Sequence, residues 1–180
     1  MPRLFVAIDL PAPQRQDLET ISIGLPKDTR WTLPEQLHLT LRFIGEVDDR
    51  LFLLIRKALA DISFKPFILL INGLGCFPSR RQPKILWAGL EENPDLAQLQ
   101  RRIEDRLVQL GLVPEERRFH PHLTLARLPP RFSPEILDAY LAEMRPAKFA
   151  PFRVDRYHLY SSALSSHGAL HRIEETYSVR

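Results

Sequence analysis

The sequence predicts an α+β protein with two similar lobes, each an antiparallel sheet with helices on its outer face, and a cleft between them. The tetrapeptide HLTL occurs twice, at residues 38–41 and 122–125. Both copies lie where apolar and polar residues alternate, which is the pattern of a half-buried strand. The copies begin 84 residues apart, at 38 and 122, which is close to half of the 180-residue chain. Helix, loop, HLTL strand and helix follow in the same order in both halves, so we expect an old structural duplication.

In the first half of the chain, the apolar residues change from the period of a strand to that of a helix. RLFVAIDL is rich in β-branched and aromatic residues, and the segment after it has apolar residues at helical spacing. LHLTLRFIG alternates strictly, and the amphipathic segment after it begins with two aspartates. We expect a strand at 3–10, a helix at 11–25, a connection at 31–35, a strand at 37–45 and a helix at 48–62.

In the second half, capping residues mark the ends of the helices. Asn93 can cap a helix that ends near Gly111, and Ser133 can cap another that has proline in its first turn. PHLTLARL is the second alternating strand. We expect helices at 93–112 and 133–145, strands at 64–77, 85–90, 121–128, 149–162 and 169–179, and a Pro-rich loop at 78–84.

Composition narrows the class of protein. Hydrophobic residues make up 44% and charged residues 26% of the chain, which is ordinary for a globular protein. No run approaches the roughly 20 apolar residues of a membrane span, and the apolar run at 4–8 is too short for a signal peptide. The single cysteine, Cys76, excludes an internal disulfide framework and a Cys-rich zinc site. We expect one bilobal domain over 1–180, a cytoplasmic monomer that does not associate with membranes.

The charge of the chain permits a phosphate-bearing partner. The net charge is +3 and the isoelectric point is about 9.2. Arg80, Arg81 and Lys84 lie together in the Pro-rich stretch, and Arg117 and Arg118 precede the second HLTL. Many such side chains are no more than solvated surface charge. The charge alone therefore does not identify a nucleic acid as the partner.

Each HLTL strand places a histidine beside a threonine. Residues i and i+2 of a strand point the same way, so His38 shares a face with Thr40, as His122 does with Thr124. One such pair is most simply a solvated polar face, but two identical pairs indicate a shared function. Across a cleft they would present two imidazoles and two hydroxyls. By the same alternation Arg42 points with His38 and Thr40, which makes it a candidate for substrate binding.

Two imidazoles and two hydroxyls suit chemistry at phosphorus. In-line displacement needs a base on the entering side and an acid on the leaving side, and histidine, with an ordinary pKa of about 6.5, can serve as either. Hydroxyls can donate hydrogen bonds to the non-bridging oxygens, where charge builds up. A cyclic phosphodiester carries one negative charge and holds its leaving oxygen on the ring. We therefore expect no metal and no other cofactor, and the spacing leaves open which histidine is the acid.

The remaining histidines offer a metal site as an alternative. His120 and His122 could share a strand face, and His167 and His171 have the H-x₃-H spacing of some zinc sites. No nearby carboxylate or cysteine completes the first set, and the second would need two further ligands in a chain that has a single cysteine. We therefore do not expect metal ligation, and for His158, in an aromatic strand, we expect a packing role.

Four stretches spread over most of the chain carry a resemblance to a known family. They are RLFVAIDLP, HLTLRFIGEV, PKILWAGL and FHPHLTLAR. Together they resemble the 2H phosphoesterases, named for paired His-x-Thr-x motifs, and within them the RNA 2′,3′-cyclic phosphodiesterases, long called 2′-5′ RNA ligases. The resemblance implies a two-lobed fold with the motifs in an active-site cleft. It also implies hydrolysis of an RNA or nucleotide 2′,3′-cyclic phosphate to a 2′-phosphomonoester, in which the 3′ oxygen leaves.

The resemblance also implies a role for each motif residue. It makes His38 the proton donor to the leaving oxygen and His122 the proton acceptor that activates water. Thr40 and Thr124 match the threonines of the family that bind the phosphate.

Beyond the motifs, the resemblance reaches two more positions. Arg127 matches a basic residue that we expect near the phosphate or the nucleotide. On an unbroken strand Arg127 would join the leucine face, so reaching the cleft requires the strand to end or bulge near Ala126. The family often has an aromatic residue where this chain has His171, so the contacts to the base stay open.

Three other functions remain as alternatives. The reverse reaction would join a 2′,3′-cyclic end to a 5′-hydroxyl through a 2′-5′ bond with the same acid and base. A non-catalytic RNA- or nucleotide-binding module would keep the cleft without turnover, although binding alone does not need two histidines. A metallohydrolase is disfavoured because few carboxylates and no cysteine lie near the motifs.

Overall fold

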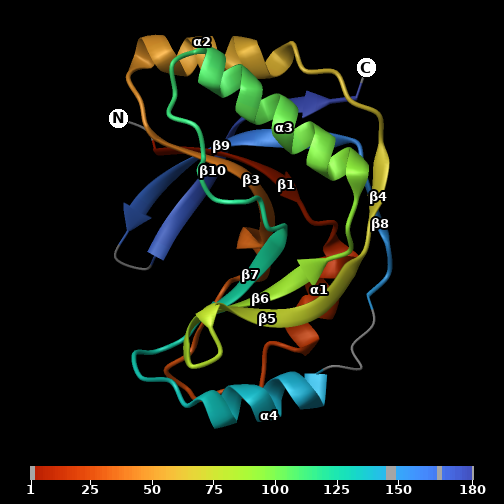
Figure 1. Cartoon of the computed structure of the whole chain (residues 1–180), viewed down its shortest axis with the longest axis vertical. Helices are drawn as coiled ribbons and strands as arrows, with labels where there is room; N and C mark the ends of the chain where they lie inside the picture. The colour runs from red at the N-terminus through yellow and green to blue at the C-terminus, as the bar shows by residue number, and fades with distance from the viewer. Residues whose placement is uncertain (1–2, 145–148, 166–167, 180) are drawn as a thin grey trace.

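The computed structural model describes residues 3–144, 149–165 and 168–179, and it has the predicted α+β architecture (Figure 1). The helices are α1 (Ala12–Thr20), α2 (Asp49–Ala60), α3 (Pro94–Gln109) and α4 (Pro134–Met144), with a 3₁₀ turn η1 (Pro34–Gln36). The strands are β1 (Arg3–Asp9), β2 (Arg30–Trp31), β3 (His38–Glu46), β4 (Phe67–Leu69), β5 (Ile71–Ser79), β6 (Gln82–Leu90), β7 (His122–Arg127), β8 (Phe152–Val154), β9 (Arg156–Ser165) and β10 (Gly168–Ser178). None of these helices is long and apolar enough to cross a membrane.

Eight strands form one antiparallel sheet that runs through both lobes. The order is β10-β9-β1-β3-β7-β6-β5, and β2 pairs with β7 beside this path. Helices α2 and α3 cover the sheet at one end of the molecule, and α1 and α4 lie at the other (Figure 1). We call the first part, with β1, β3, β9 and β10, the upper lobe and the second, with β2, β5, β6 and β7, the lower lobe. Strands β4 and β8 form a separate two-stranded ladder.

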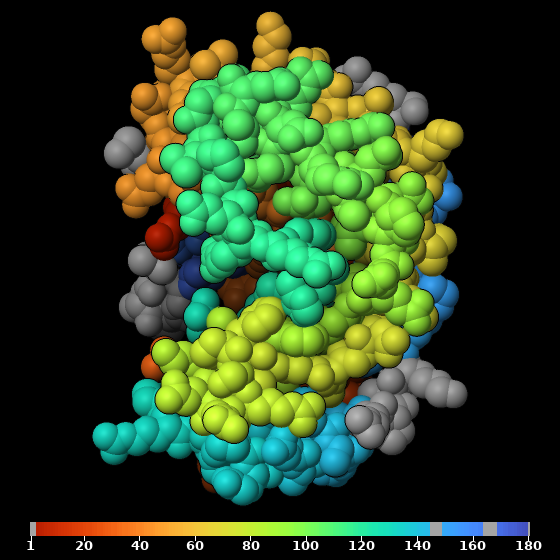
Figure 2. Space-filling model, in the orientation of Figure 1, coloured from red at the N-terminus to blue at the C-terminus, as the bar shows by residue number. Residues whose placement is uncertain are grey.

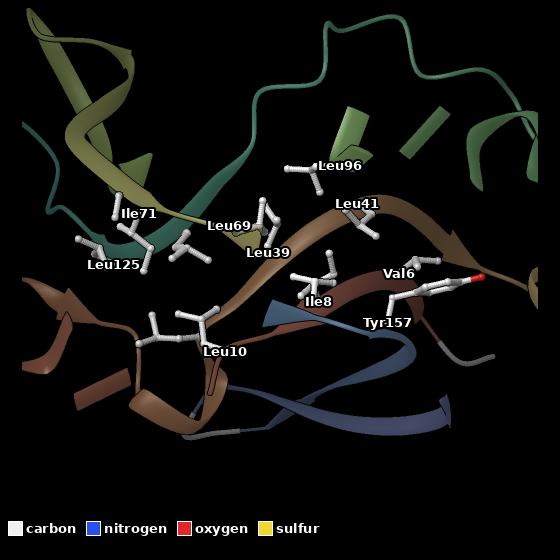
Figure 3. Packing of buried hydrophobic residues seen from close by; sticks show 14 of the residues in the cluster. Val6, Ile8, Leu10, Leu39, Leu41, Leu69, Ile71, Leu96, Leu125 and Tyr157 are labelled. Atoms are coloured by element: carbon white, nitrogen blue, oxygen red, sulfur yellow. The ribbon is translucent and has the colours of Figure 1, made fainter. Parts of the chain in front are cut away.

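The two lobes meet at a single pair of strand residues. Strands β3 and β7 share one Cα pairing, Leu39 with Leu123, and both leucines are fully buried. Their side chains belong to a hydrophobic core that includes residues of both lobes. Figure 3 shows Leu39 beside Leu69, and Leu125 beside Ile71, within this core. The expected pair of sheets is therefore one sheet, narrowed to a minimal join at its centre.

Neither lobe corresponds to one half of the chain. The upper lobe takes β1 and β3 from the N-terminal half but β9 and β10 from the end of the chain. The lower lobe combines β5 and β6 from the first half with β7 from the second. The duplicated order of elements is therefore interleaved in space.

Several expected boundaries are confirmed, and one segment is corrected. Asn93 accepts a hydrogen bond from the backbone N–H of Leu96, and Ser133 accepts one from Ile136, as expected for caps. The predicted Pro-rich loop at 78–84 is wrong, because β5 and β6 form a hairpin that turns at 80–81. Pro78 is tolerated there because β5 is an edge strand, where proline's missing N–H removes no bond to a further strand.

Other boundaries differ in length. The expected helix at 11–25 ends at Thr20, and the strand at 64–77 divides into β4 and β5. The strand at 149–162 likewise divides into β8 and β9. The short strand β2 and the turn η1 arise in the expected connection at 31–35 and just before it.

We predict that Leu39→Ala lowers the free energy of unfolding by about 2–5 kcal/mol, because Leu39 is fully buried where the lobes join. The matched control is Leu53→Ala on α2, where the leucine is 60% exposed, and it should cost less than about 0.5 kcal/mol. Urea denaturation of both variants measures the difference. Equal, small losses would contradict the central position of Leu39.

Candidate active site

The two HLTL strands lie side by side, and this brings their polar residues together. The residues that flank an antiparallel Cα pair oppose one another crosswise. The pairing of Leu39 with Leu123 therefore sets His38 opposite Thr124 and Thr40 opposite His122. All four point away from the leucine face, which packs into the core, and all four are half-buried. The predicted set of two imidazoles and two hydroxyls is thus assembled within one sheet, on the face opposite the helices.

Both motif histidines are held by the same hydrogen bond. Nδ1 of His38 lies 2.7 Å from the backbone oxygen of Gln36, and Nδ1 of His122 lies 2.7 Å from that of His120. A carbonyl oxygen can only accept, so Nδ1 carries the hydrogen in each ring. Nε2 is therefore the nitrogen that remains to accept or donate a proton at the site.

Aromatic rings surround His38. Its ring centroid lies 5.0 Å from that of Phe5, 5.4 Å from that of His171 and 6.2 Å from that of Tyr160. These rings come from β1, β9 and β10, and Tyr160 also stacks on Phe5. The Tyr160 hydroxyl donates to Asp9, whose Cα is paired with that of His38.

His122 has a similar set of neighbours in the lower lobe. Its ring centroid lies 5.0 Å from that of Phe77, 6.2 Å from that of His120 and 6.4 Å from that of Trp87. Each motif histidine is thus enclosed by a phenylalanine, a second histidine and a larger aromatic residue. Nδ1 of His171 and Nε1 of Trp87 are buried and find no hydrogen-bond partner among the described residues, so water or a ligand must supply one.

Burial sets the protonation of both motif histidines. Loss of solvation lowers the pKa of His38 to about 4, an effect that the Gln36 carbonyl partly opposes and nearby His171 reinforces. Burial likewise lowers the pKa of His122, again with partial opposition from its carbonyl partner. Both imidazoles are therefore neutral near pH 7 in the ligand-free protein.

Each motif strand bulges at the last leucine of its HLTL. In β3, Thr40 is paired with Ala7 and Arg42 with Val6, so Leu41 has no partner in β1. In β7, Thr124 is paired with Trp87 and Ala126 with Leu86, so Leu125 has none in β6. An extra residue reverses the alternation of the strand beyond it.

The bulge in β3 overturns the prediction for Arg42. Its guanidinium is directed to the α3 side, where Nε donates to Glu104 at 2.5 Å and another nitrogen to the backbone oxygen of Val113 at 2.5 Å. The placement of Arg42 beside His38 and Thr40 is therefore wrong, because strict alternation does not continue past Leu41.

The bulge in β7 has the opposite consequence for Arg127. The sequence required a bulge near Ala126 for this side chain to leave the leucine face, and the bulge is present. Ala126 is buried and Arg127 is exposed. Arg127 lines a cavity of about 1000 Å³ at the end of β7.

The chain matches a known protein family over most of its length. The family model described as the 2′-5′ RNA ligase superfamily matches residues 11–165. The chain belongs to the 2′-5′ RNA ligase superfamily. It is 30% identical, over 94% of its length and 96% of the relative's, to a protein of Archaeoglobus fulgidus named RNA 2′,3′-cyclic phosphodiesterase. A protein of the same name in Aeropyrum pernix is 34% identical over 83% of this chain and 84% of its own.

Solved structures share the fold of this superfamily member over nearly its whole length. A protein of Thermus thermophilus superposes with a TM-score of 0.80 at 26% identity, covering 99% of this chain and 98% of its own. E. coli LigT, crystallised with 3′-AMP, superposes with a TM-score of 0.75 at 25% identity, covering 99% and 97%. These matches agree with the two-lobed α+β prediction.

The described residues contain no group of three or more His, Cys, Asp or Glu side chains that could hold a metal ion. His120 lies beside His122, as its spacing allowed. His167, half of the H-x₃-H alternative, lies outside the described residues. His158 is buried and its Nδ1 lies 2.9 Å from the hydroxyl of Thr176, which confirms the packing role.

Several site neighbours were missed by sequence reasoning. Phe5, Phe77, Trp87 and Tyr160 surround the two histidines, but each lies in an ordinary strand pattern. Their apolar side chains gave the same signal as core residues. Only the register between strands shows that they lie on the site face.

We predict that the His38 imidazole titrates near pH 4 in the ligand-free protein, and NMR of the His38 ring protons against pH measures this. The folded-state pKa lies below the ordinary value of 6.5, so the unfolded chain binds more protons between these values. The free energy of unfolding should therefore fall as the pH is lowered from about 6.5 to about 4. The His38→Asn variant should lose part of this dependence. A His38 midpoint above 6.5 would contradict the burial argument.

We predict that Gly75→Ala displaces Trp87, because a Cβ at position 75 would lie 2.3 Å from Trp87 Cζ2. In a Trp31→Phe background the fluorescence reports Trp87 alone, and its emission should shift. The control Gly111→Ala strains a residue with φ of 91°, where an added Cβ would meet no other side chain within 4 Å, so it should lower stability without moving the emission. An unchanged spectrum in Gly75→Ala would show that Trp87 is not held as described.

Proposed function

We propose that this chain hydrolyses 2′,3′-cyclic phosphates of RNA or nucleotides to 2′-phosphomonoesters by acid–base catalysis with His38 and His122. The crosswise placement of two His/Thr pairs around the Leu39–Leu123 join carries the proposal. The names of the relatives, RNA 2′,3′-cyclic phosphodiesterase, support it. Both motifs come from one chain, so we propose that the 180 residues act as a single domain and that a monomer suffices.

The reaction proceeds in line at phosphorus. Nε2 of one histidine takes a proton from water, and the water oxygen forms a bond to phosphorus. The bond from phosphorus to the 3′ oxygen breaks on the opposite side, and that oxygen takes a proton from Nε2 of the other histidine. The hydroxyls of Thr40 and Thr124 donate to the non-bridging oxygens as their charge grows. The product keeps its phosphate on the 2′ oxygen.

Asp9 supports the assignment of His38 as the acid. Asp9 is the strand neighbour of His38, and its charge raises the pKa of that imidazole against the effect of burial. The corresponding neighbour of His122 on β6 is Gly89, and among the described residues burial, the His120 carbonyl and the His120 ring, but no carboxylate, shift the pKa of His122. Asp9 therefore offers the protonated form of His38 a partner that His122 lacks among the described residues, although burial dominates in the ligand-free protein and lowers the pKa of His38 to about 4. The anionic substrate raises the pKa of His38 further when it binds.

The same site could join two RNA ends instead of hydrolysing one. A 5′-hydroxyl would replace water as the nucleophile, the base would take its proton, and the acid would again protonate the leaving 3′ oxygen, which leaves a 2′-5′ bond. The family description, which names 2′-5′ RNA ligases, favours this as the second candidate. We propose hydrolysis as the main reaction because water at its bulk concentration competes with any bound hydroxyl.

The proposed function predicts turnover of a 2′,3′-cyclic nucleotide in excess EDTA, with a 2′-phosphomonoester as the product identified by ³¹P NMR. His38→Asn and His122→Asn should each lower kcat by about 10²–10⁴-fold. His120→Asn is the matched control, because it keeps the backbone carbonyl that holds His122, and it should lower kcat less than about tenfold.

The outcomes separate the alternatives. Loss of turnover in EDTA would contradict the metal-free mechanism. Near-wild-type turnover in both histidine variants would remove His38 and His122 from the site. Binding of the nucleotide without its consumption would identify a binding module.

A further inference from the structure

A cavity of about 1000 Å³ lies in the lower lobe, where β7 ends. Its walls come from the connection before β2, the hairpin of β5 and β6, and the segment after β7. Figure 1 shows that hairpin turn lying beside the segment after β7, and in the space-filling view of Figure 2 both reach the surface at the same end of the molecule. We call it the basic pocket, after its five cations Arg30, Arg81, Lys84, Arg127 and Arg131; its one acidic residue is Asp28.

The strand register concentrates this charge. Arg30 of β2 and Ile85 of β6 are the Cα partners of Arg127 on either side. Cross-strand partners point to the same face of the sheet. The side chains of Arg30 and Arg127 therefore leave the same face of the sheet at neighbouring positions, where like charges repel. An anion between them would relieve the repulsion.

The cations of the basic pocket have no ion-pair partner among the described residues. Other arginines of the chain do: Arg42 pairs with Glu104, and Arg80, at the hairpin turn, pairs with Asp138. All five cations of the pocket are exposed. Their charges are thus available to a ligand rather than committed within the fold.

The basic pocket lies at the end of β7, three residues beyond Thr124 of the candidate active site. Thr124 and Arg127 lie on the same face because of the bulge at Leu125. Three residues of strand span about 10 Å. A chain whose last phosphate lies at His122 and Thr124 can therefore reach Arg127 within its next one or two linkages.

We propose that the basic pocket binds the backbone phosphates of the single-stranded RNA that leads to the cyclic end. This inference rests on the proposed function and names its substrate class as RNA chains rather than free nucleotides. A positively charged groove that follows the backbone is the usual way to hold a single strand without regard to sequence. Ile85, Pro129 and Pro130 give the pocket an apolar wall for sugars and bases.

The test compares three substrates at one salt concentration. They are 2′,3′-cyclic AMP, the same nucleotide with a 5′-phosphate, and a five-nucleotide adenylate that ends in a 2′,3′-cyclic phosphate. For the wild type, kcat/KM for the five-nucleotide substrate should exceed that for 2′,3′-cyclic AMP by about 10–100-fold, mostly through KM. The slope of log kcat/KM against log salt should be steeper for the longer substrate.

A triple variant removes three cations of the basic pocket: Arg30→Ala, Arg81→Ala and Arg131→Ala. It should lose most of the gain for the five-nucleotide substrate and change kcat/KM for 2′,3′-cyclic AMP less than twofold. The matched control is Arg50→Ala, Arg101→Ala and Arg106→Ala, three exposed arginines of α2 and α3. It changes the net charge equally and should keep the gain.

Direct binding separates this inference from the proposed function. Fluorescence anisotropy with a labelled five-nucleotide RNA that ends in a 2′-phosphate should show weaker binding for the pocket variant than for the wild type and the control, whether or not any substrate is hydrolysed. Equal binding by all three proteins would overturn the inference. So would an equal kcat/KM for mononucleotide and five-nucleotide substrates, or a full gain from the 5′-phosphate alone, which would assign the pocket to small nucleotides.

Discussion

The pairing of Leu39 with Leu123 is the contact on which the site depends. It is a single step of antiparallel ladder, yet it fixes the positions of the residues on both sides of it. Because the flanking positions oppose crosswise, each histidine is given a threonine from the other lobe. The leucines pack into the hydrophobic core, and the histidines and threonines occupy the other face of the same strands. In each HLTL tetrapeptide, the two leucines determine the packing, and the histidine and threonine that alternate with them form the candidate site.

In the proposed mechanism, the apolar surroundings favour one of the two proton transfers and oppose the other. Burial keeps both histidines neutral near pH 7. A general base must be neutral, so burial favours that role for His122. A general acid must carry a proton to donate, so burial opposes that role for His38. Asp9 and the charge of a bound phosphate both work against burial at His38. Under the proposed mechanism, the acid acquires its proton together with its substrate. Asp9 beside His38 and Gly89 beside His122 make the two histidine environments chemically different.

The sequence predicted the strands, most helices and the pairing of the motifs, because alternation and caps are local signals. It failed where the outcome depended on pairing between strands. The bulges at Leu41 and Leu125 cannot be recognised from the alternation of the residues that precede them. These bulges direct Arg42 to Glu104 and Arg127 to the basic pocket. The hairpin at 80–81 was hidden because prolines, which usually indicate a loop, are accepted on an edge strand.

Because the lobes are interleaved along the chain, the residues around His38 are synthesised at different times. Both motif histidines have been synthesised once β7 is made, but Tyr160 and His171, which enclose His38, are added only with β9 and β10. Until then β1 lacks the neighbour that covers its outer edge. Contacts between distant parts of a chain form late and slowly. A nascent chain therefore carries both HLTL motifs before His38 has its full set of aromatic neighbours.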